Sequence, residues 1–219
     1  MRVVIVGAGR LGQQVANALS MARNEVTLVE HDRALAEKTK ESSRARVLYG
    51  DAADPSVLES AGALKADVLV ALSGEDQVNL VVGLLAKRHF DVPRVVARVN
   101  DPENHWLFTE EWGVDVAVSA SATLLSLIQE ATSASDTVAL LHLGTAGVNI
   151  IETTITEHSA AAGKSLSDLS LPEGAIVAAV LRGGQPSVPG GSFALEVGDE
   201  VIVIAESATD ADIRKAFQR

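Results

Sequence analysis

The residues with the clearest chemical potential form a glycine-rich turn near the N-terminus. An apolar run over residues 2–6 leads into Gly-Ala-Gly-Arg-Leu-Gly at residues 7–12. Its glycines permit a tight turn, a close approach of backbone to phosphate, and packing of the following helix. That helix would present free N–H groups and a positive dipole end to an anion. The predicted nucleotide contacts in this turn are Gly7, Gly9, Arg10, Leu11 and Gly12.

An acidic residue lies where a nucleotide bound to this turn would place its ribose. Glu30 ends a second β-like run, at roughly the spacing of 20 residues that ribose-binding acids show. Its carboxylate can accept hydrogen bonds from ribose hydroxyls, and its charge would repel the 2′-phosphate of NADP. A glycine turn of purely structural meaning is the alternative. The order strand, turn, helix, strand and acid favours nucleotide binding.

Further polar residues follow the next predicted strands, whose carboxyl ends share one sheet edge. Asp51, beside Ala52, is predicted to contact adenosine, although a Gly-Asp turn would explain it equally simply. Ser73 lies in the next such loop and could approach phosphate or ribose. Arg98 ends the fifth strand, where a phosphate contact and an ion pair with an acid such as Asp101 are equal alternatives.

The elements that must position these residues alternate in a βαβ pattern over 1–118. Strands are predicted at 2–6, 25–29, 46–49, 67–71, 94–99 and 114–118, and helices at 10–22, 32–42, 55–61, 76–89 and 103–112. Asp54, Asp76 and Asp101 are expected to cap helices, the first and last because proline follows them. The pattern predicts an α/β fold with a Rossmann-like doubly wound parallel sheet.

The pattern changes from residue 119 onward. A helical stretch over 122–131 and a polar linker precede a β-rich region. The expected elements are strands at 138–143, 148–156, 175–181, 193–195 and 201–205, a turn-rich connection at 183–191, a helical turn at 166–169 and a helix at 209–217. The predicted domains are therefore 1–118, a crossover helix and linker at 119–135, and a small β-rich α+β lobe at 136–219.

Composition limits the classes of function. The 219 residues are 47% apolar but only 3% aromatic, and no cysteine occurs, which excludes disulfides and thiolate sites. The formal net charge of −11 opposes binding to nucleic acid or anionic lipid. No apolar run approaches the ~20 residues of a membrane span, and the N-terminus lacks a signal-peptide pattern. We therefore expect a cytoplasmic protein without direct membrane insertion.

Residues for catalysis are not evident in the sequence. Tyr49 is the only tyrosine and no lysine follows it at reductase spacing, while the five histidines show neither dyad nor metal-ligand spacing. The prediction is a non-enzymatic nucleotide-binding protein; a small NAD-dependent oxidoreductase and a methyltransferase are the alternatives. Trp106 and Trp112 share a predicted helix. They are either core residues or part of an exposed face used for assembly, and the second alternative is slightly favoured.

Longer segments resemble a known family. The order GAGRLG, YGDAADPSVLESAG, ADVLVALSGEDQVNL, VARVNDPEN and WGVDVAVSA is similar to an RCK domain, a regulator of potassium conductance. The run from GKSLSDLSLPEGAIVAAVLR to GDEVIVIA resembles the C-terminal lobe of these proteins, the TrkA-C module. Together they resemble a Trk/Ktr-type regulatory subunit carrying one RCK unit.

The resemblance implies a function that composition does not show. Such subunits bind NAD(H) or ATP/ADP, assemble as dimers or larger rings, and gate a potassium-translocating membrane protein from its cytoplasmic face. By position, the glycine turn, Glu30, Asp51, Ser73 and Arg98 match ligand-binding positions, and the helix over 122–133 matches the crossover helix. Ala53 departs from the Thr or Ser of many relatives.

Overall fold

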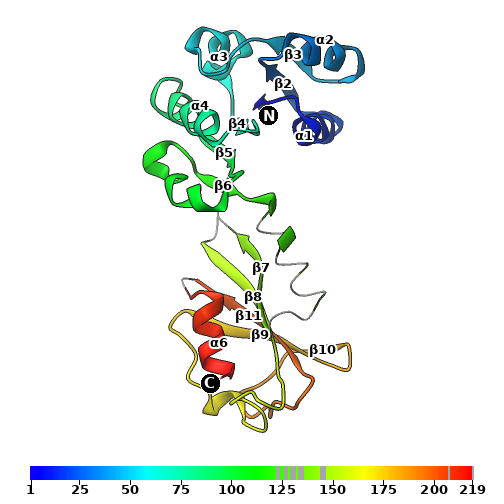
Figure 1. The fold of residues 1–219 in the computed structure, drawn as a ribbon, viewed down its shortest axis with the longest axis vertical. Coiled ribbons are helices and arrows are strands. Elements are labelled where there is room, and N and C mark those ends of the chain that lie inside the picture. Colours follow the sequence, from blue (N-terminus) through cyan, green and yellow to red (C-terminus); the bar gives the residue numbers. More distant parts are fainter. Residues whose placement is uncertain are drawn as a thin grey trace. The chain divides into compact units, whose positions relative to one another are not determined.

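The protein divides into two compact units, residues 1–121 and 122–219. The computed structural model describes residues 1–121, 124–125, 128, 132, 136–143, 147–206 and 208–218 (Figure 1). Most of the helix predicted over 122–133 therefore lies outside the described residues. Among the helices that are described, none combines the length and the apolar character needed to cross a bilayer.

The N-terminal unit contains a six-stranded sheet in which every neighbouring pair of strands is parallel. Its strands are β1 (Arg2–Val6), β2 (Glu25–Glu30), β3 (Arg46–Tyr49), β4 (Val68–Ala71), β5 (Arg94–Arg98) and β6 (Val116–Val118). The strand order is β3-β2-β1-β4-β5-β6. The predicted doubly wound α/β fold is confirmed. Because the order reverses beside β1, the sheet has its switch point at the carboxyl ends of β1 and β4.

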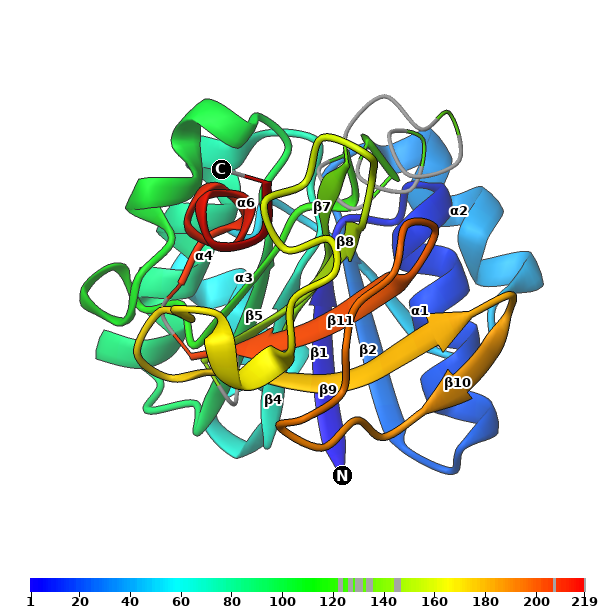
Figure 2. The same cartoon turned by 90° about the horizontal axis from the view of Figure 1, so that it is seen from below.

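Helices cover both faces of this sheet, as alternation along β1 requires. Val3 and Ile5 pack with α1 and α2, whereas Val4 and Val6 pack with α3 and α4. The helices are α1 (Arg10–Met21), α2 (Arg33–Ser42), α3 (Pro55–Ala61) and α4 (Asp76–Arg88), with a short 3₁₀ turn η1 (Ala63–Lys65) after α3. Figure 2 shows α1 and α2 on one side of the strands and α3 and α4 on the other.

The single helix predicted over 103–112 is wrong. Two 3₁₀ helices, η2 (Pro102–Leu107) and η3 (Glu110–Trp112), occupy this segment. Phe108 turns inward and is buried, and its ψ of 71° takes the backbone out of the helical region between them. Trp106 and Trp112 therefore lie on separate turns, and both are exposed.

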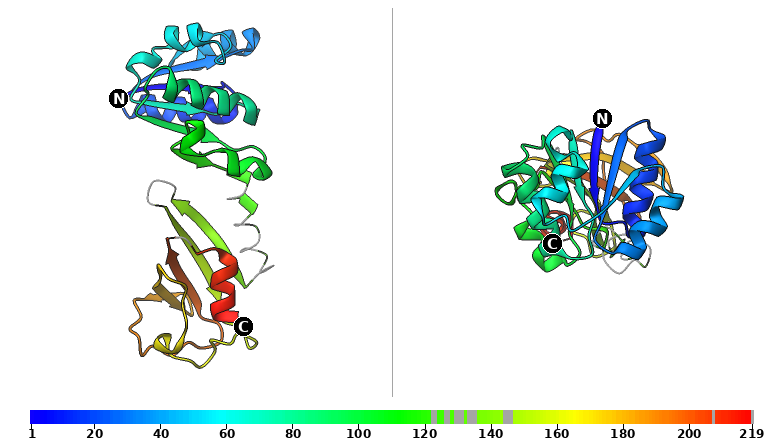
Figure 3. Two further views of the ribbon diagram at one scale, coloured as in Figure 1. Left: turned by 90° about the vertical axis from the view of Figure 1, so that its left-hand side faces the viewer. Right: turned by 90° about the horizontal axis from the view of Figure 1, so that it is seen from above.

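The C-terminal unit contains an antiparallel five-stranded sheet in the order β10-β9-β11-β8-β7. Its elements are β7 (Thr137–Leu143), β8 (Val148–Thr154), the 3₁₀ turn η4 (Leu166–Asp168), β9 (Ala175–Arg182), β10 (Gln185–Ser187), β11 (Glu200–Ala205) and α6 (Asp210–Gln218). Figure 3 shows α6 lying along β7 and β8. Ile213 and Phe217 of α6 are fully buried against the sheet, in a core separate from those of the N-terminal unit.

Two local predictions in this unit are wrong. The connection predicted at 183–191 contains β10, which pairs with β9 because Gly183 and Gly184 both take positive φ (57° and 76°). Two consecutive residues with positive φ form the tight turn that hairpins favour. Residues 193–195 form no strand; a single bridge joins Ala194 to Ser165.

Candidate nucleotide-binding site

The glycine turn closes tightly on itself and leaves one open position. Gly7 has φ +98°, and a Cβ there would lie 3.0 Å from the backbone of Leu72. A Cβ on Gly12 would lie only 1.9 Å from the Gly7 carbonyl oxygen, so α1 packs directly on the turn. Among the described residues, in contrast, a Cβ on Gly9 would meet no neighbour within 4 Å, and no side chain caps the helix that follows it. The start of α1 therefore offers free N–H groups beside open space.

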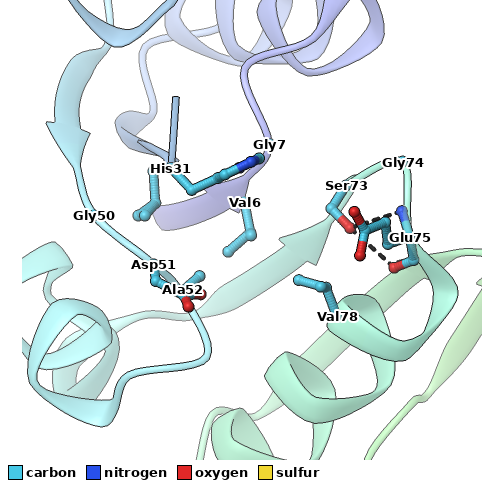
Figure 4. Close-up of a pocket in the computed structure, with 11 residues that line it drawn as sticks. Val6, Gly7, His31, Gly50, Asp51, Ala52, Ser73, Gly74, Glu75 and Val78 are labelled. Carbon is cyan, nitrogen blue, oxygen red and sulfur yellow. Dashed lines mark hydrogen bonds between the residues drawn. The ribbon is translucent and has the colours of Figure 1, made fainter. Parts of the chain in front are cut away.

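Two adjoining cavities lie at the carboxyl ends of the parallel strands. The first has a volume of about 510 Å³ and the second about 620 Å³, and both are lined by Gly7, His31, Ser73 and Gly74. Figure 4 shows the first, with Asp51 and Ala52 facing Val78 and the Ser73 loop. The second is lined by Gly9, Arg10, Leu11, Gly12, Glu30 and Arg98. Every residue predicted to contact a nucleotide thus lines one of the two.

Glu30 is already hydrogen-bonded within the protein, which its predicted role in ribose binding did not include. The side chain is only 5% exposed. Its Oε2 accepts the Ala8 N–H at 2.6 Å, and its Oε1 accepts the Asp32 N–H at 2.9 Å. The carboxylate therefore ties the glycine turn to the end of β2. It also lines the second cavity, where an oxygen that accepts one bond retains capacity for another.

His31 was not predicted to take part in this site. Its Nδ1 lies 3.0 Å from Glu30 Oε1, and its side chain, 78% exposed, lines both cavities. Only its position directly after the acid at a strand end could have indicated this. When Nδ1 carries the hydrogen toward Glu30, Nε2 is left as an acceptor.

The loop after β3 shows turn hydrogen bonding and also places Asp51 at a cavity. Asp51 lines the first cavity, and its Oδ1 also accepts the Ala53 N–H at 2.9 Å, as turn chemistry requires. Asp54 caps α3 as expected: its Oδ1 accepts the Ser56 N–H at 2.8 Å, and Pro55 opens the helix. The cap fixes where the loop ends, and so holds Asp51 at the cavity.

The Ser73 loop is held in place by buried and half-buried side chains whose role was not predicted from the sequence. Asn79 is fully buried; its Oδ1 accepts the Ser73 N–H at 2.9 Å, and its Nδ2 donates to the carbonyl oxygens of Ser73 and Arg98. In the sequence, this role of Asn79 was indicated only by an amide side chain among the apolar residues of α4. The Ser73 hydroxyl donates to the Glu75 carbonyl at 3.0 Å, closing a local turn.

Asp76 is not the helix cap that was predicted. Glu75 occupies the cap position, and Asp76 points inward with 6% exposure. Burial opposes its charge, but hydrogen bonds from Asn104, Asn100 and the Asp101 backbone outweigh burial and hold the pKa of Asp76 below its usual value. The carboxylate oxygens of Asp76 accept hydrogen bonds from the segment after β5, so they do not cap the start of α4.

The two cavities differ in charge. Arg10 and Arg98 line the second cavity, and the Nε of Arg98 is buried without a hydrogen-bond partner among the described residues. The proposed ion pair of Arg98 with Asp101 is absent from the ion pairs of the described residues; the Asp101 side chain instead caps η2 through Glu103 N at 3.0 Å. Carboxylates line both cavities, Glu30 and Asp32 in the second and Asp51 and Glu75 in the first, but only the second cavity also has arginines. The second cavity suits phosphate, and the first suits groups that donate hydrogen bonds.

Within the described part of the chain, no three His, Asp or Glu residues are grouped so as to hold a metal ion. The arrangement at the strand ends thus consists of backbone N–H groups, two guanidinium groups, carboxylates and one imidazole. These groups can bind a phosphorylated, hydroxyl-bearing molecule by charge and hydrogen bonding.

Known proteins share both parts of the chain. Residues 3–120 match the TrkA-N domain and residues 150–218 match the TrkA-C domain. The Trk system potassium uptake protein TrkA of Mycobacterium tuberculosis is 41% identical over 217 residues, covering 98% of this chain and 97% of the relative.

Solved structures agree on the fold. The GsuK channel superposes with a TM-score of 0.59 at 17% identity, over 100% of this chain and 39% of its own. The C-terminal domain of Kef from Shewanella denitrificans, in its AMP-bound form, gives a TM-score of 0.51 at 28% identity, over 62% of this chain and 83% of that one. On the matches to both domains and the near full-length identity, the chain belongs to the TrkA family of Trk system potassium uptake proteins.

Proposed function

We propose that this chain is a nucleotide-sensing regulatory subunit of a potassium uptake system. The observation that carries the proposal is the open glycine turn at Gly9, facing a cavity with two arginines, in a chain of the TrkA family. A ligand held there changes the protein only if it binds two conformations with different affinity. Gating of the transporter would follow from that difference.

The charge of the two cavities supports a specific placement of the ligand. Phosphates would lie in the second cavity, at the start of α1 between Arg10 and Arg98. The adenosine would lie in the first cavity, beside Asp51 and Ala52, with its ribose near Glu30 and His31. NAD(H) and ATP/ADP share these groups, and the AMP-bound Kef domain supports an adenine nucleotide.

The proposed organisation follows from the same assignment. Residues 1–118 would bind the nucleotide, 119–135 would form the crossover helix and linker, and 136–219 would complete an RCK subunit. A homodimer or higher ring of such subunits would act from the cytoplasmic side on a potassium-translocating membrane protein, which the name of the TrkA relative supports. The subunit itself would carry out no reaction.

Titration calorimetry with ADP, ATP, NAD and NADH tests the nucleotide assignment, with GTP as the control for base selectivity. We expect at least one adenine nucleotide to bind and GTP to bind more weakly. Potassium flux through the co-purified membrane partner in vesicles, with and without that nucleotide, tests regulation. Absence of binding by all four adenine compounds would refute the proposal.

A small NAD-dependent oxidoreductase remains the second candidate, because the glycine turn and Glu30 serve such enzymes equally well. Oxidation of NADH with a panel of carbonyl substrates separates the two functions. Steady turnover would favour the enzyme, whereas unchanged NADH after binding favours a regulatory subunit.

A further inference from the structure

A partly buried polar cluster lies behind the Ser73 loop, and neither helix capping nor direct ligand contact accounts for it. Its members are Asp76, Asn79, Asn100 and Asn104. Asp76 is 6% exposed and Asn79 is fully buried. Burying a charge and an amide is costly unless each is hydrogen-bonded. The bonds of these side chains go mainly to backbone groups of two segments, and Asp76 also accepts bonds from the side chains of Asn100 and Asn104. The cluster therefore fixes the relative position of those segments.

The first of these segments is the Ser73 loop, which lines both cavities. Asn79 bonds both backbone groups of Ser73, at 2.9 Å to the N–H and 3.1 Å to the carbonyl oxygen. Asn100 Nδ2 donates to the same carbonyl oxygen at 3.1 Å. Asn100 follows β5, so the loop is tied both to α4 and to the chain beyond the next strand.

The second segment is the one that runs from Asn100 into η2. Asp76 Oδ1 accepts the Asn100 backbone N–H at 2.7 Å and its Nδ2 at 3.0 Å. Asp76 Oδ2 accepts the Asp101 N–H at 3.0 Å and Asn104 Nδ2 at 2.9 Å. Asn104 lies in η2, which carries Trp106 at 73% exposure. The Asp76 carboxylate, directly after Glu75 of the cavity wall, thus binds the segment that leads into a surface turn.

We propose that Asp76 is a positioning residue that couples the ligand-facing turn Ser73–Glu75 to η2. Because Asn100 Nδ2 bonds both Ser73 and Asp76, the turn and η2 keep one common arrangement or lose these bonds together. Ligand contact with the turn would thereby restrict η2, some distance along the chain from the cavity. This conclusion rests on the proposed function only in taking the ligand to be a nucleotide.

Amide hydrogen exchange of the ligand-free, full-length protein tests the coupling without any ligand. In Asp76→Asn, an amide replaces the acceptor that faces four donors, so Asn100 and Asp101 should exchange faster by about tenfold or more. Coupling predicts that the Ser73 amide also exchanges faster, although its own acceptor on Asn79 is unchanged. Faster exchange at 100 and 101 alone would overturn the proposal.

Asp115→Asn is the matched control within the same unit. Its carboxylate accepts the Val95 N–H at 2.5 Å and pairs with Lys87 at 2.8 Å, near the start of β5 and away from the cavities. The same chemical change there should leave Ser73 exchange as in the wild type. Equal acceleration of Ser73 in both variants would mean general loosening, and would also overturn the proposal.

Tryptophan fluorescence then tests the coupling to η2, in a Trp112→Phe background where Trp106 is the only indole. Addition of ADP should change Trp106 emission. Asn104→Ala, which removes one bond between η2 and Asp76, should reduce that change while ADP affinity stays within about twofold. An unaltered response in Asn104→Ala overturns the coupling. If the wild type binds no ADP or NAD(H), the proposed function fails, whereas the exchange data still decide the role of Asp76.

Discussion

At the residue scale, the glycine turn contains two positions with opposite tolerance for a side chain. A methyl group at Gly12 would collide with the Gly7 carbonyl oxygen at 1.9 Å, whereas one at Gly9 would meet no atom within 4 Å in the part of the chain that the structure describes. Gly9 has φ −60°, which any residue adopts. The fold itself would therefore tolerate a side chain at Gly9.

We predict that Gly9→Ala leaves stability nearly unchanged but weakens ADP or NAD(H) binding at least tenfold, because the methyl group fills the phosphate approach. Gly12→Ala should lower the free energy of unfolding by on the order of 1–3 kcal/mol, from overpacking against backbone. Urea unfolding and calorimetry measure the two effects. Wild-type nucleotide affinity in Gly9→Ala would contradict the proposed phosphate position.

Glu30 and Arg10 require different tests, because Glu30 is buried and bonded to backbone whereas Arg10 is exposed. Arg10 is exposed, so Arg10→Ala should keep its stability and lose affinity about tenfold or more, as for a charged hydrogen bond. Glu30→Ala would leave the Ala8 and Asp32 N–H groups without their acceptor and should also lower stability.

Glu30→Gln separates these effects, because the amide keeps the volume and one acceptor oxygen. We expect it to unfold at lower denaturant than the wild type but higher than Glu30→Ala. Calorimetry with NAD and NADP then measures the effect of the charge. If Glu30→Ala is as stable as Arg10→Ala, the tie between the glycine turn and β2 is energetically unimportant.

At the element scale, the β9–β10 hairpin depends on two glycines with positive φ. Gly184 has φ +76° and open space around its missing side chain, so any cost of alanine there arises from the backbone alone. We predict that Gly184→Ala lowers stability by about 1 kcal/mol or somewhat more. Gly190→Ala, also with open space but without positive φ, is the control. Equal unfolding midpoints for the two variants would contradict this account.

The elements that the sequence predicted well are those with strong local signals. Asp54 before Pro55 fixed the start of α3, and the aliphatic runs over 2–6 and 94–99 gave the buried parallel strands. β10 was missed because its three residues follow Gly-Gly and include Pro186, which the composition of a turn explains equally well. Its pairing with β9 is a tertiary contact that the local sequence does not display.

The candidate site was predictable to the same extent and for the same reason. The glycine turn and Glu30 carry a spacing that sequence displays. The roles of Asp76 and Asn79 depend on contacts with Ser73, Asn100 and Asn104, which lie six to twenty-eight positions away. Asp76 begins α4, so it had the local pattern of a cap, and only the packed segment after β5 shows where its carboxylate is used.

At the scale of the whole molecule, each of the two units depends on one buried aspartate with a lowered pKa. In the N-terminal unit it is Asp76. In the C-terminal unit it is Asp199, 1% exposed, whose pKa is lowered chiefly by hydrogen bonds from Arg182, against the opposing effect of burial. The Arg182 guanidinium lies at 2.7 Å from both oxygens of this carboxylate. Two separate cores thus have the same acid-sensitive feature.

The sign of the pH dependence follows from these directions. A folded pKa below the unfolded value of about 3.9 means that the unfolded chain binds protons more readily. The stabilisation is complete above about pH 5 and is lost as pH falls through the lowered folded values. We therefore predict a free energy of unfolding that changes little between about pH 5 and 7 on account of these two groups and falls below about pH 4.

Asp199→Asn assigns part of this dependence to one residue. It should lower the stability of the C-terminal unit by about 1–3 kcal/mol at pH 7, since Arg182 loses a charged acceptor. As the pH falls below about 4 its stability should begin to approach that of the wild type, because the unfolded wild-type chain takes up a proton at Asp199 that the folded carboxylate resists. Urea unfolding at about pH 7, 5 and 3.5 measures both trends. A difference between variant and wild type that stays constant down to the most acidic condition would show that packing around Asp199, and not its charge, stabilises this unit.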